Sequence, residues 1–206
     1  MTKVLKINSS LYSQDGQSSQ LATQFVDALR EREPGIRVVE RDLAREPVPH
    51  LDAARFQAFL TKPEERTAEQ AAVAASSDAL IQELREADVV VLGLPMYNFG
   101  ISSQLKAYFD HVARAGVTFR YTEKGPVGLL TGKKAYVFAT RGGAYAGTPG
   151  DTQTAYVRQF LGFLGIKDVE FVYAESLAIS PASRETSLAQ ARAAIQNLAP
   201  PVQLAA

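Results

Sequence analysis

Residues 89–100 read VVVLGLPMYNFG, and this stretch decides the predicted fold. The unbroken apolar run over 89–94 is typical of a strand that is buried on both faces, as the central strands of a parallel sheet are. Ile101, Leu105 and Val112 then follow at helical spacing. Residues 95–100 are therefore predicted to form the turn between the carboxyl end of a central strand and a helix, which is where open α/β sheets bind ligands.

This turn carries two aromatic side chains and an amide, Tyr97, Phe99 and Asn98. Such a set suits a flat ring system with polar edges. The alternative is that the two aromatic rings only cap the sheet, and position alone leaves both interpretations open.

The composition is that of an ordinary globular protein. Of the 206 residues, 46% are hydrophobic and 21% are charged, and 22 acidic residues balance 22 basic ones. A net charge of zero argues against nucleic acid or an anionic membrane as the main partner. No apolar run is long enough to span a bilayer, and the chain enters a strand at once, so neither a membrane segment nor a signal peptide is expected. With no Cys, the composition fits the cytoplasm.

Metal binding and side-chain acid–base catalysis find no support in the sequence. The two histidines, His50 and His111, lie far apart, and no carboxylates stand at metal-ligand spacing around them. His111 is interpreted as a solvated residue near the carboxyl end of a helix, where its charge suits the helix dipole. We therefore expect no metal site, and we nominate no catalytic acid or base.

The rest of the chain alternates between predicted strands and helices. Strands are expected at residues 4–8, 36–41, 89–94, 135–139 and 169–173, with helices between them and a helix from 156 to 164. This alternation predicts one α/β domain over residues 1–206. It is a flavodoxin-like three-layer sandwich with a five-stranded parallel sheet of order 2-1-3-4-5, and that order binds FMN at the switch point between strands 1 and 3.

Two segments exceed this minimal fold. Residues 42–67 form an insertion rich in proline and charge, which we expect to be a pocket wall or a subunit contact. Residues 117–126 are expected to form a small β-hairpin in which Phe119 and Tyr121 share one face.

A polar loop, residues 9–19, joins the first strand to the first helix. Free backbone N–H groups and the helix dipole favour an anion there, and serine hydroxyls can add donors to a phosphate. The loop has neither the P-loop pattern nor the dinucleotide glycine pattern. The alternative is an ordinary helix N-cap at Ser18 or Ser19 after a loop.

A third loop follows the fourth strand and begins TRGGAY at residues 140–145. Two consecutive glycines let backbone N–H groups approach a ligand closely, although a plain turn would read the same way. Strands 1, 3 and 4 are neighbours in the predicted order, so the three loops would line one crevice. A phosphate site, a place for a flat ring and N–H donors for the ring's edge match the three parts of FMN.

The chain also resembles the bacterial FMN-dependent NADH azoreductases, which are NAD(P)H-quinone oxidoreductases as well. The resemblance covers nearly the whole chain and rests on four motifs: PMYNF (95–99), TRGG (140–143), ARAGVTFRY (113–121) and FLGFLG (160–165). It implies a homodimer with two active sites at the interface and one FMN per subunit. It also implies ping-pong, two-electron transfer from NADH or NADPH through FMN to quinones, and the cleavage of aromatic azo bonds to amines.

The same resemblance implies which residues contact FMN. They are Ser10, Gly16, Gln17, Ser18, Met96, Tyr97, Asn98, Phe99, Thr140, Arg141, Gly142 and Gly143. Asn98 is expected near the N5–O4 edge of the flavin and Gly142 and Gly143 near its N3–O2 edge, where Arg141 would add positive potential. Phe119 and Tyr121 are candidates for the substrate wall across the dimer.

Two of these positions depart from the family pattern. Gly16 and Thr140 stand where serine is expected in close relatives. Thr140 keeps the hydroxyl, whereas Gly16 offers only its backbone to a phosphate.

Two other function classes use the same fold. A flavodoxin-type one-electron carrier would typically be strongly acidic, whereas this chain is neutral and carries the insertion at 42–67. An aspartyl-phosphate receiver or hydrolase would need an Asp at the end of a central strand. Strands 1 and 3 end in Asn8 and Pro95, which disfavours that class.

Overall fold

The computed structural model describes residues 1–198, and its centre is one parallel sheet. The sheet strands are β1 (Lys3–Asn8), β2 (Arg37–Asp42), β3 (Val89–Pro95), β6 (Lys134–Thr140) and β7 (Asp168–Ala174). They lie in the order β2-β1-β3-β6-β7, and every neighbouring pair is parallel. The predicted order 2-1-3-4-5 is therefore confirmed.

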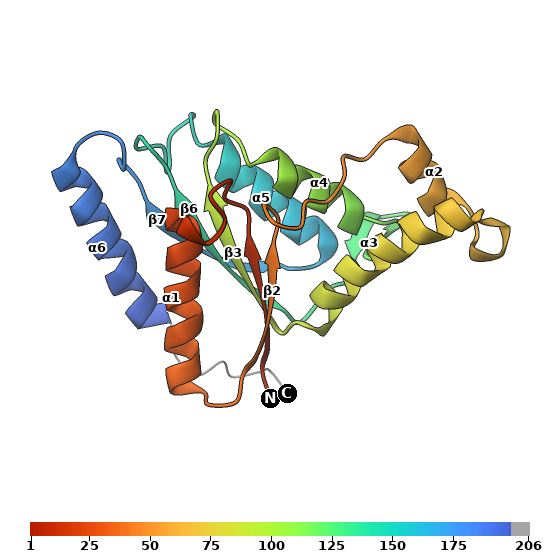
Figure 1. The fold of residues 1–206 in the computed structure, drawn as a ribbon, viewed down its shortest axis with the longest axis horizontal. Coiled ribbons are helices and arrows are strands. Elements are labelled where there is room, and N and C mark those ends of the chain that lie inside the picture. Colours follow the sequence, from red (N-terminus) through yellow and green to blue (C-terminus); the bar gives the residue numbers. More distant parts are fainter. Residues whose placement is uncertain (199–206) are drawn as a thin grey trace.

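Helices cover both faces of the sheet (Figure 1). On one face lie α1 (Gln17–Arg32) and α6 (Pro181–Leu198), and on the other lie α3 (Ala68–Glu86), α4 (Ser103–Val112) and α5 (Thr152–Leu164). Successive side chains of a strand point to opposite faces, so β1 feeds both cores: Val4 packs with α1 and α6, and Leu5 packs with α3, α4 and α5.

Strand β3 is buried along its whole length, as predicted for a central strand. The polar interruption in β1, Lys6, is buried as well. Its Nζ donates hydrogen bonds to Thr23 Oγ1 of α1 (2.6 Å) and to Glu40 Oε1 of β2 (3.2 Å). A lysine can occupy this position because both neighbours offer oxygen acceptors.

The insertion contains α2 (Ala53–Leu60), which stands outside the sandwich against α3 (Figure 1). Helix α3 begins after a complete capping box between Thr67 and Gln70. Two large apolar side chains of α2 remain exposed: Phe56 at 51% and Leu60 at 60%. The insertion thus presents apolar surface to solvent in the isolated subunit.

A two-stranded hairpin, β4 (Phe119–Thr122) and β5 (Gly125–Gly128), packs against the carboxyl end of α5. Leu130 N donates to Leu164 O (2.8 Å) just after the hairpin. A Cβ on Gly128 would lie 2.1 Å from Gly165 N, so only glycine fits at this contact. Helix α5 ends there because Gly165 adopts a left-handed conformation, with φ +109°.

Two expectations from the sequence were wrong. His111 is not solvated: it is 2% exposed, and its ring lies edge-on to Phe59 with centroids 5.5 Å apart. Burial lowers the pKa of the His111 imidazole, because the charged form is disfavoured away from water. Helix α5 begins at Thr152 rather than at 156, since Asp151 accepts a hydrogen bond from Thr154 N (3.0 Å) and caps it.

Within residues 1–198, none of the helices is long and apolar enough to cross a membrane.

Candidate cofactor site

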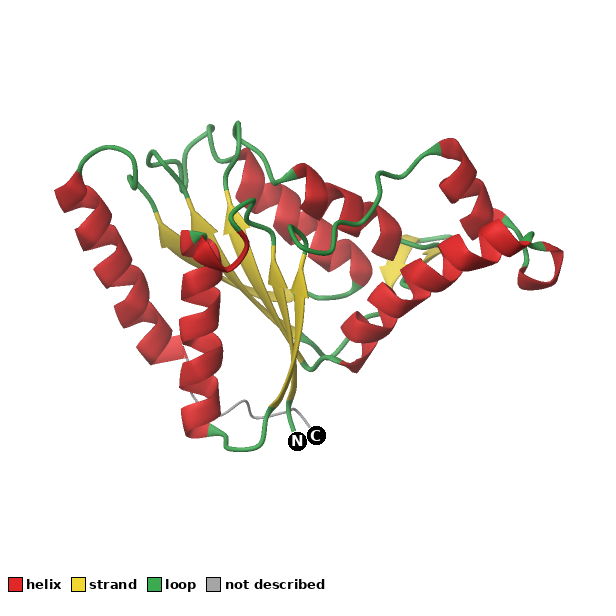
Figure 2. Cartoon of the chain, viewed as in Figure 1, coloured by secondary structure: helices red, strands yellow, loops and turns green. Residues whose placement is uncertain are grey.

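The three predicted loops meet at the edge of the sheet toward which the strands point (Figure 2). Hydrogen bonds tie them together in pairs. Ser9 Oγ donates to Gly93 O (2.7 Å), and Leu11 N donates to Tyr97 Oη (3.1 Å). Met96 N donates to Thr140 O (2.9 Å). The loops after β1, β3 and β6 therefore form one connected rim, as the strand order requires.

The amino terminus of α1 offers donors to an anion. Gly16 is the N-cap, and Gln20 N is the first amide with an intrahelical acceptor, Gly16 O (2.9 Å). Ser18 is completely buried, and its hydroxyl has no hydrogen-bond partner among the described residues. The cap makes no side-chain hydrogen bond, so the alternative that Ser18 or Ser19 caps the helix is wrong. The free amides and the orphaned hydroxyl suit a phosphate.

Steric crowding explains why position 16 is glycine rather than the expected serine. A Cβ at this position would lie 2.1 Å from Ser10 Oγ and 2.5 Å from Ser10 Cβ. Ser10 is itself buried, and its Oγ accepts a hydrogen bond from Tyr12 N (3.2 Å). In this chain, Ser10 fills the space that a side chain at position 16 would need.

The turn after β3 holds two consecutive residues in the left-handed region. Asn98 has φ +49° and Phe99 has φ +65°, which is uncommon for asparagine and strained for phenylalanine. Tyr97 and Gly100 close the turn with two reciprocal backbone hydrogen bonds of 2.9 Å. The Phe99 side chain is 57% exposed, and its ring lies edge-on to Tyr145 at 5.6 Å. The turn thus presents its amide and its aromatic ring outward.

The expected role of Arg141 needs correction. Its side chain is fully buried, and its guanidinium donates to Glu175 Oε1 (3.1 Å), Asp151 Oδ1 (2.8 Å) and Thr154 Oγ1 (2.9 Å). Two carboxylates neutralise its charge beneath the turn. Arg141 therefore does not direct its charge at the crevice.

The glycines beside Arg141 can still donate from their backbone. Gly142 O and Gly143 O accept hydrogen bonds from Ala178 N and Ser176 N (3.0 Å each), which fixes the turn. Among the described residues, neither Gly142 N nor Gly143 N has an acceptor. These two unpaired amides can supply positive potential at this turn, whereas the paired side chain of Arg141 cannot.

Taken together, the donors fit FMN. A helix amino terminus with an orphaned hydroxyl suits a single phosphate, and the two glycine amides suit carbonyl oxygens on the edge of a ring. The outward turn at Asn98 and Phe99 lies between them along the rim, because β3 is the strand between β1 and β6.

The two substrate-wall candidates lie apart from this rim. Phe119 is 7% exposed and packs on Phe163 with ring centroids 4.3 Å apart, so it belongs to the core rather than to an open wall. Tyr121 is 74% exposed, but its hairpin contacts the carboxyl end of α5. The amino end of that helix lies at the rim, about 20 Å away for 13 residues. Tyr121 therefore cannot line the crevice of its own subunit.

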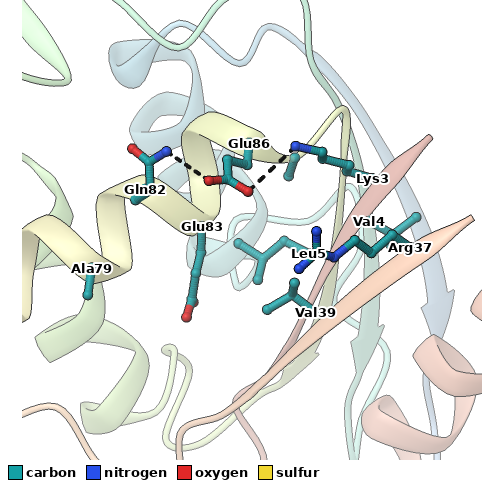
Figure 3. A pocket seen from close by; sticks show the side chains of 10 residues that line it. Lys3, Val4, Leu5, Arg37, Val39, Ala79, Gln82, Glu83 and Glu86 are labelled. Atoms are coloured by element: carbon teal, nitrogen blue, oxygen red, sulfur yellow. Dashed lines mark hydrogen bonds and ion pairs between the residues drawn. The ribbon is translucent and has the colours of Figure 1, made fainter. Parts of the chain in front are cut away.

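A hollow of about 270 Å³ lies at the opposite end of the sheet (Figure 3). Lys3 and Arg37, the first residues of β1 and β2, line it beside the carboxyl end of α3. Three of its lining residues interact: Glu86 accepts a hydrogen bond from Gln82 (2.8 Å) and pairs with Lys3 (3.6 Å). None of the three cofactor loops contributes to this hollow, so it has no part in the site.

Sequence reasoning missed the residues that support the rim. Asp151, Gln153 and Glu175 bind the turns from beneath and were not nominated. The one available signal was the run DTQT at 151–154, which is a helix N-cap pattern. Glu175 gave no signal, because its partners are more than 25 residues away in the chain.

Comparison with known proteins identifies the family. Residues 2–199 match the model of a family described as having a flavodoxin-like fold. An FMN-dependent NADH:quinone oxidoreductase 6 of Burkholderia lata is 57% identical over 195 residues, which cover 95% of this chain and 98% of that protein. An FMN-dependent NADH:quinone oxidoreductase of Cellvibrio japonicus is 58% identical over 177 residues, which cover 86% and 89%.

Solved structures agree with this result. An azoreductase of Bacillus anthracis str. Sterne superimposes with a TM-score of 0.88 at 31% identity, over 97% of this chain and 99% of that one. A FMN-dependent NADH-azoreductase of Bacillus anthracis str. Ames Ancestor, solved in complex with FMN, gives 0.86 at 28% identity over 97% and 100%. The resemblance inferred from the four motifs is confirmed. The chain belongs to the flavodoxin-like family, among the FMN-dependent NADH:quinone oxidoreductases and azoreductases.

Proposed function

We propose that this protein is an FMN-dependent NADH:quinone oxidoreductase that also cleaves aromatic azo compounds to amines. The observation that carries the proposal is the rim itself. Among the described residues, unpaired donors stand at the start of α1 (Ser18), which suits one phosphate, and on the turn after β6 (Gly142 and Gly143), which suits a ring edge, with the aromatic turn after β3 between them. The proposed reaction is the one that the names of the relatives reported above describe. Because NADH is a reductant of the cytoplasm, we also propose that the protein is located there.

The chain's own residues bind and orient the cofactor. The first amides of α1 and the Ser18 hydroxyl would hold the phosphate, with Gln17 in the same turn of helix. Gly142 N and Gly143 N would hold the carbonyl edge of the ring. When bound, FMN would supply two-electron transfer from NADH to a quinone; cleavage of an azo bond to two amines takes four electrons and therefore two such rounds. Met96, Tyr97 and Phe99 would form the wall that limits access of water to the ring.

A homodimer would complete the site. Tyr121 is exposed but cannot reach its own crevice, so a partner subunit's crevice is where its ring can serve as a substrate wall. The described surface also exposes Phe56, Leu60 and Val127, the last at 42%, on α2 and the same hairpin. Apolar side chains of this kind on two extra segments favour an interface between subunits.

The test starts with purified protein reconstituted with flavin. We expect cofactor released by denaturation to have the mass of FMN, and one NADH to be consumed per benzoquinone reduced, with parallel double-reciprocal lines. Light scattering of the same sample should give the mass of a dimer. Binding of FAD, or of no flavin, would overturn the cofactor assignment. Bound FMN with no quinone-dependent oxidation of NADH would favour the one-electron carrier.

Replacing Ser18 with alanine is expected to weaken FMN binding about ten- to hundredfold, because a hydrogen bond to a charged group is lost. The melting temperature of the FMN-free protein should stay unchanged or rise slightly, since the hydroxyl is buried without a partner among the described residues. Fluorescence titration with FMN and a thermal melt measure the two effects. Ser76→Ala, which removes an exposed hydroxyl on α3, is the matched control. An unchanged dissociation constant would contradict the assignment of Ser18 to the phosphate.

A further inference from the structure

The first turn of α5 lies directly beneath the turn formed by residues 95–100. Gln153 is 1% exposed, and its Nε2 donates to Pro95 O (2.9 Å) and to Gly100 O (3.2 Å). Its neighbour Thr152 donates through Oγ1 to Phe99 O. One amide group therefore bridges the two ends of the turn, and one hydroxyl holds the carbonyl of Phe99.

The residues on either side of this pair hold the other ring-facing turn. Asp151 and Thr154 both accept from Arg141 Nη2, at 2.8 Å and 2.9 Å. Glu175 completes the support, because its Oε1 accepts from Tyr145 N and Ala146 N (2.8 Å each). Four consecutive residues of α5 and its cap thus fix the turns after β3 and β6 relative to each other.

The chemistry of Gln153 indicates that it is more than a packing residue. Its Oε1 is buried without a partner among the described residues, which costs stability that an apolar side chain of similar size would not. The compensation is the bridge from Nε2 to Pro95 O and Gly100 O. That bridge spans the segment in which Asn98 and Phe99 hold left-handed conformations, and such conformations persist only where the surroundings fix them.

We propose that Gln153 is a positioning residue that sets the shape of the Met96–Phe99 turn for the bound flavin, with Thr152 as its auxiliary. Only the effect that we expect on catalysis rests on the proposed function. The positioning itself is a property of the FMN-free chain. It is therefore tested first without cofactor.

The central variant is Gln153→Met, which keeps the length of the side chain and removes the donor. In FMN-free protein, exchange of the hydrogen-bonded amides of Met96, Tyr97 and Gly100 should accelerate about tenfold, as expected for the loss of one or two neutral hydrogen bonds. FMN should bind about tenfold more weakly, and the visible absorption band of the bound flavin should shift. Gln159→Met, the same change at an exposed position of α5, should alter none of these.

Thr152→Val provides a second variant at an exposed position, so that a folding failure of Gln153→Met does not end the test. It should speed exchange of the Met96, Tyr97 and Gly100 amides and raise the KM for benzoquinone severalfold more than it lowers kcat. Unchanged exchange in the turn and an unchanged flavin spectrum in both variants would overturn the proposal, even if melting temperatures fall. Failure of the proposed function would appear separately, as wild-type protein that lacks flavin or quinone reduction.

Discussion

Replacing Arg141 with methionine is expected to lower the free energy of unfolding by about 3–5 kcal/mol, because it leaves two carboxylates without their buried cation. The Arg141 side chain is fully buried, and those of its partners Asp151 and Glu175 are only 7% and 19% exposed. Removing one member of a buried ion network costs more than the network contributes, since the remaining charges cannot be solvated. Denaturant unfolding at neutral pH measures the change.

The loss of unfolding free energy in Arg141→Met should become smaller as the pH falls. In the wild type, burial alone would raise the pKa of the Asp151 carboxyl, but hydrogen bonds from Arg141 and Thr154 outweigh burial and hold that pKa below its usual range. Asp151 therefore stabilises the wild type at pH values above the pKa it has in the unfolded chain. It loses this effect as the pH falls through its lower folded pKa. In the Arg141→Met variant, the pKa of Asp151 in the folded state should rise. The Asp151 carboxyl should therefore take up a proton between neutral pH and about pH 4, and the difference in stability from the wild type should become smaller.

Arg30→Met is the matched control for this prediction. Arg30 pairs with Asp27 on the surface, where both side chains are more than half exposed. Such a pair contributes roughly 0–1 kcal/mol, so this variant should unfold close to the wild type at every pH. A loss at Arg141 no larger than the loss at Arg30 would contradict the account of the buried network.

Gly128→Ala is expected to destabilise the protein by about 3 kcal/mol, an effect at the upper end for a single added methyl group. The new Cβ would lie 2.1 Å from Gly165 N and 2.2 Å from Leu164 C. Both are backbone atoms at the end of α5, so no side-chain rotation relieves the overlap. The hairpin would have to move away from the helix, and it would carry Tyr121 with it. The free energy of unfolding and near-ultraviolet circular dichroism of the aromatic cluster would report the change.

Gly162→Ala distinguishes steric overlap from any general effect of glycine replacement. Gly162 lies within α5, three residues before Gly165, and a Cβ there would meet nothing within 4 Å. Alanine favours the helix over glycine by about 0.5–1 kcal/mol, so this variant should be stabilised. Equal effects at positions 128 and 162 would disprove the packing argument.

Hydrophobic patterning predicted the sheet because it reports burial directly. The run at 89–94 has no polar interruption, and in the structure all of β3 is buried. The mixed strand at 36–41 became the edge strand β2, as its exposed positions required. Strand order then followed from fold-level rules, and it brought the three cofactor loops together. The polar loop at 9–19, the aromatic turn and the glycine turn were all predicted to lie on one crevice.

The predictions that the structure corrects concern residues whose contacts lie far away in the chain. Arg141 reads as a free cation beside two glycines, and only the fold brings Glu175 and Asp151 to neutralise it. Phe119 alternates with Tyr121 on a predicted hairpin, yet Phe163 of α5 covers only the first of them. His111 is buried because Phe59 of the insertion packs on it. Periodicity reports which face of an element is apolar, but it does not report which neighbour will cover a polar group.

The arrangement of α5 has a consequence that genetics would reveal. One end of this helix supports the cofactor turns, and the other end carries the hairpin with Tyr121. In the proposed dimer, the turns of one subunit meet the hairpin of the other. Consider a mixed dimer in which one subunit carries a substitution in its turns and the other carries a substitution in its hairpin. One of its two sites would then contain both substitutions, and the other site would contain neither. Two inactive alleles of a single gene would then complement each other.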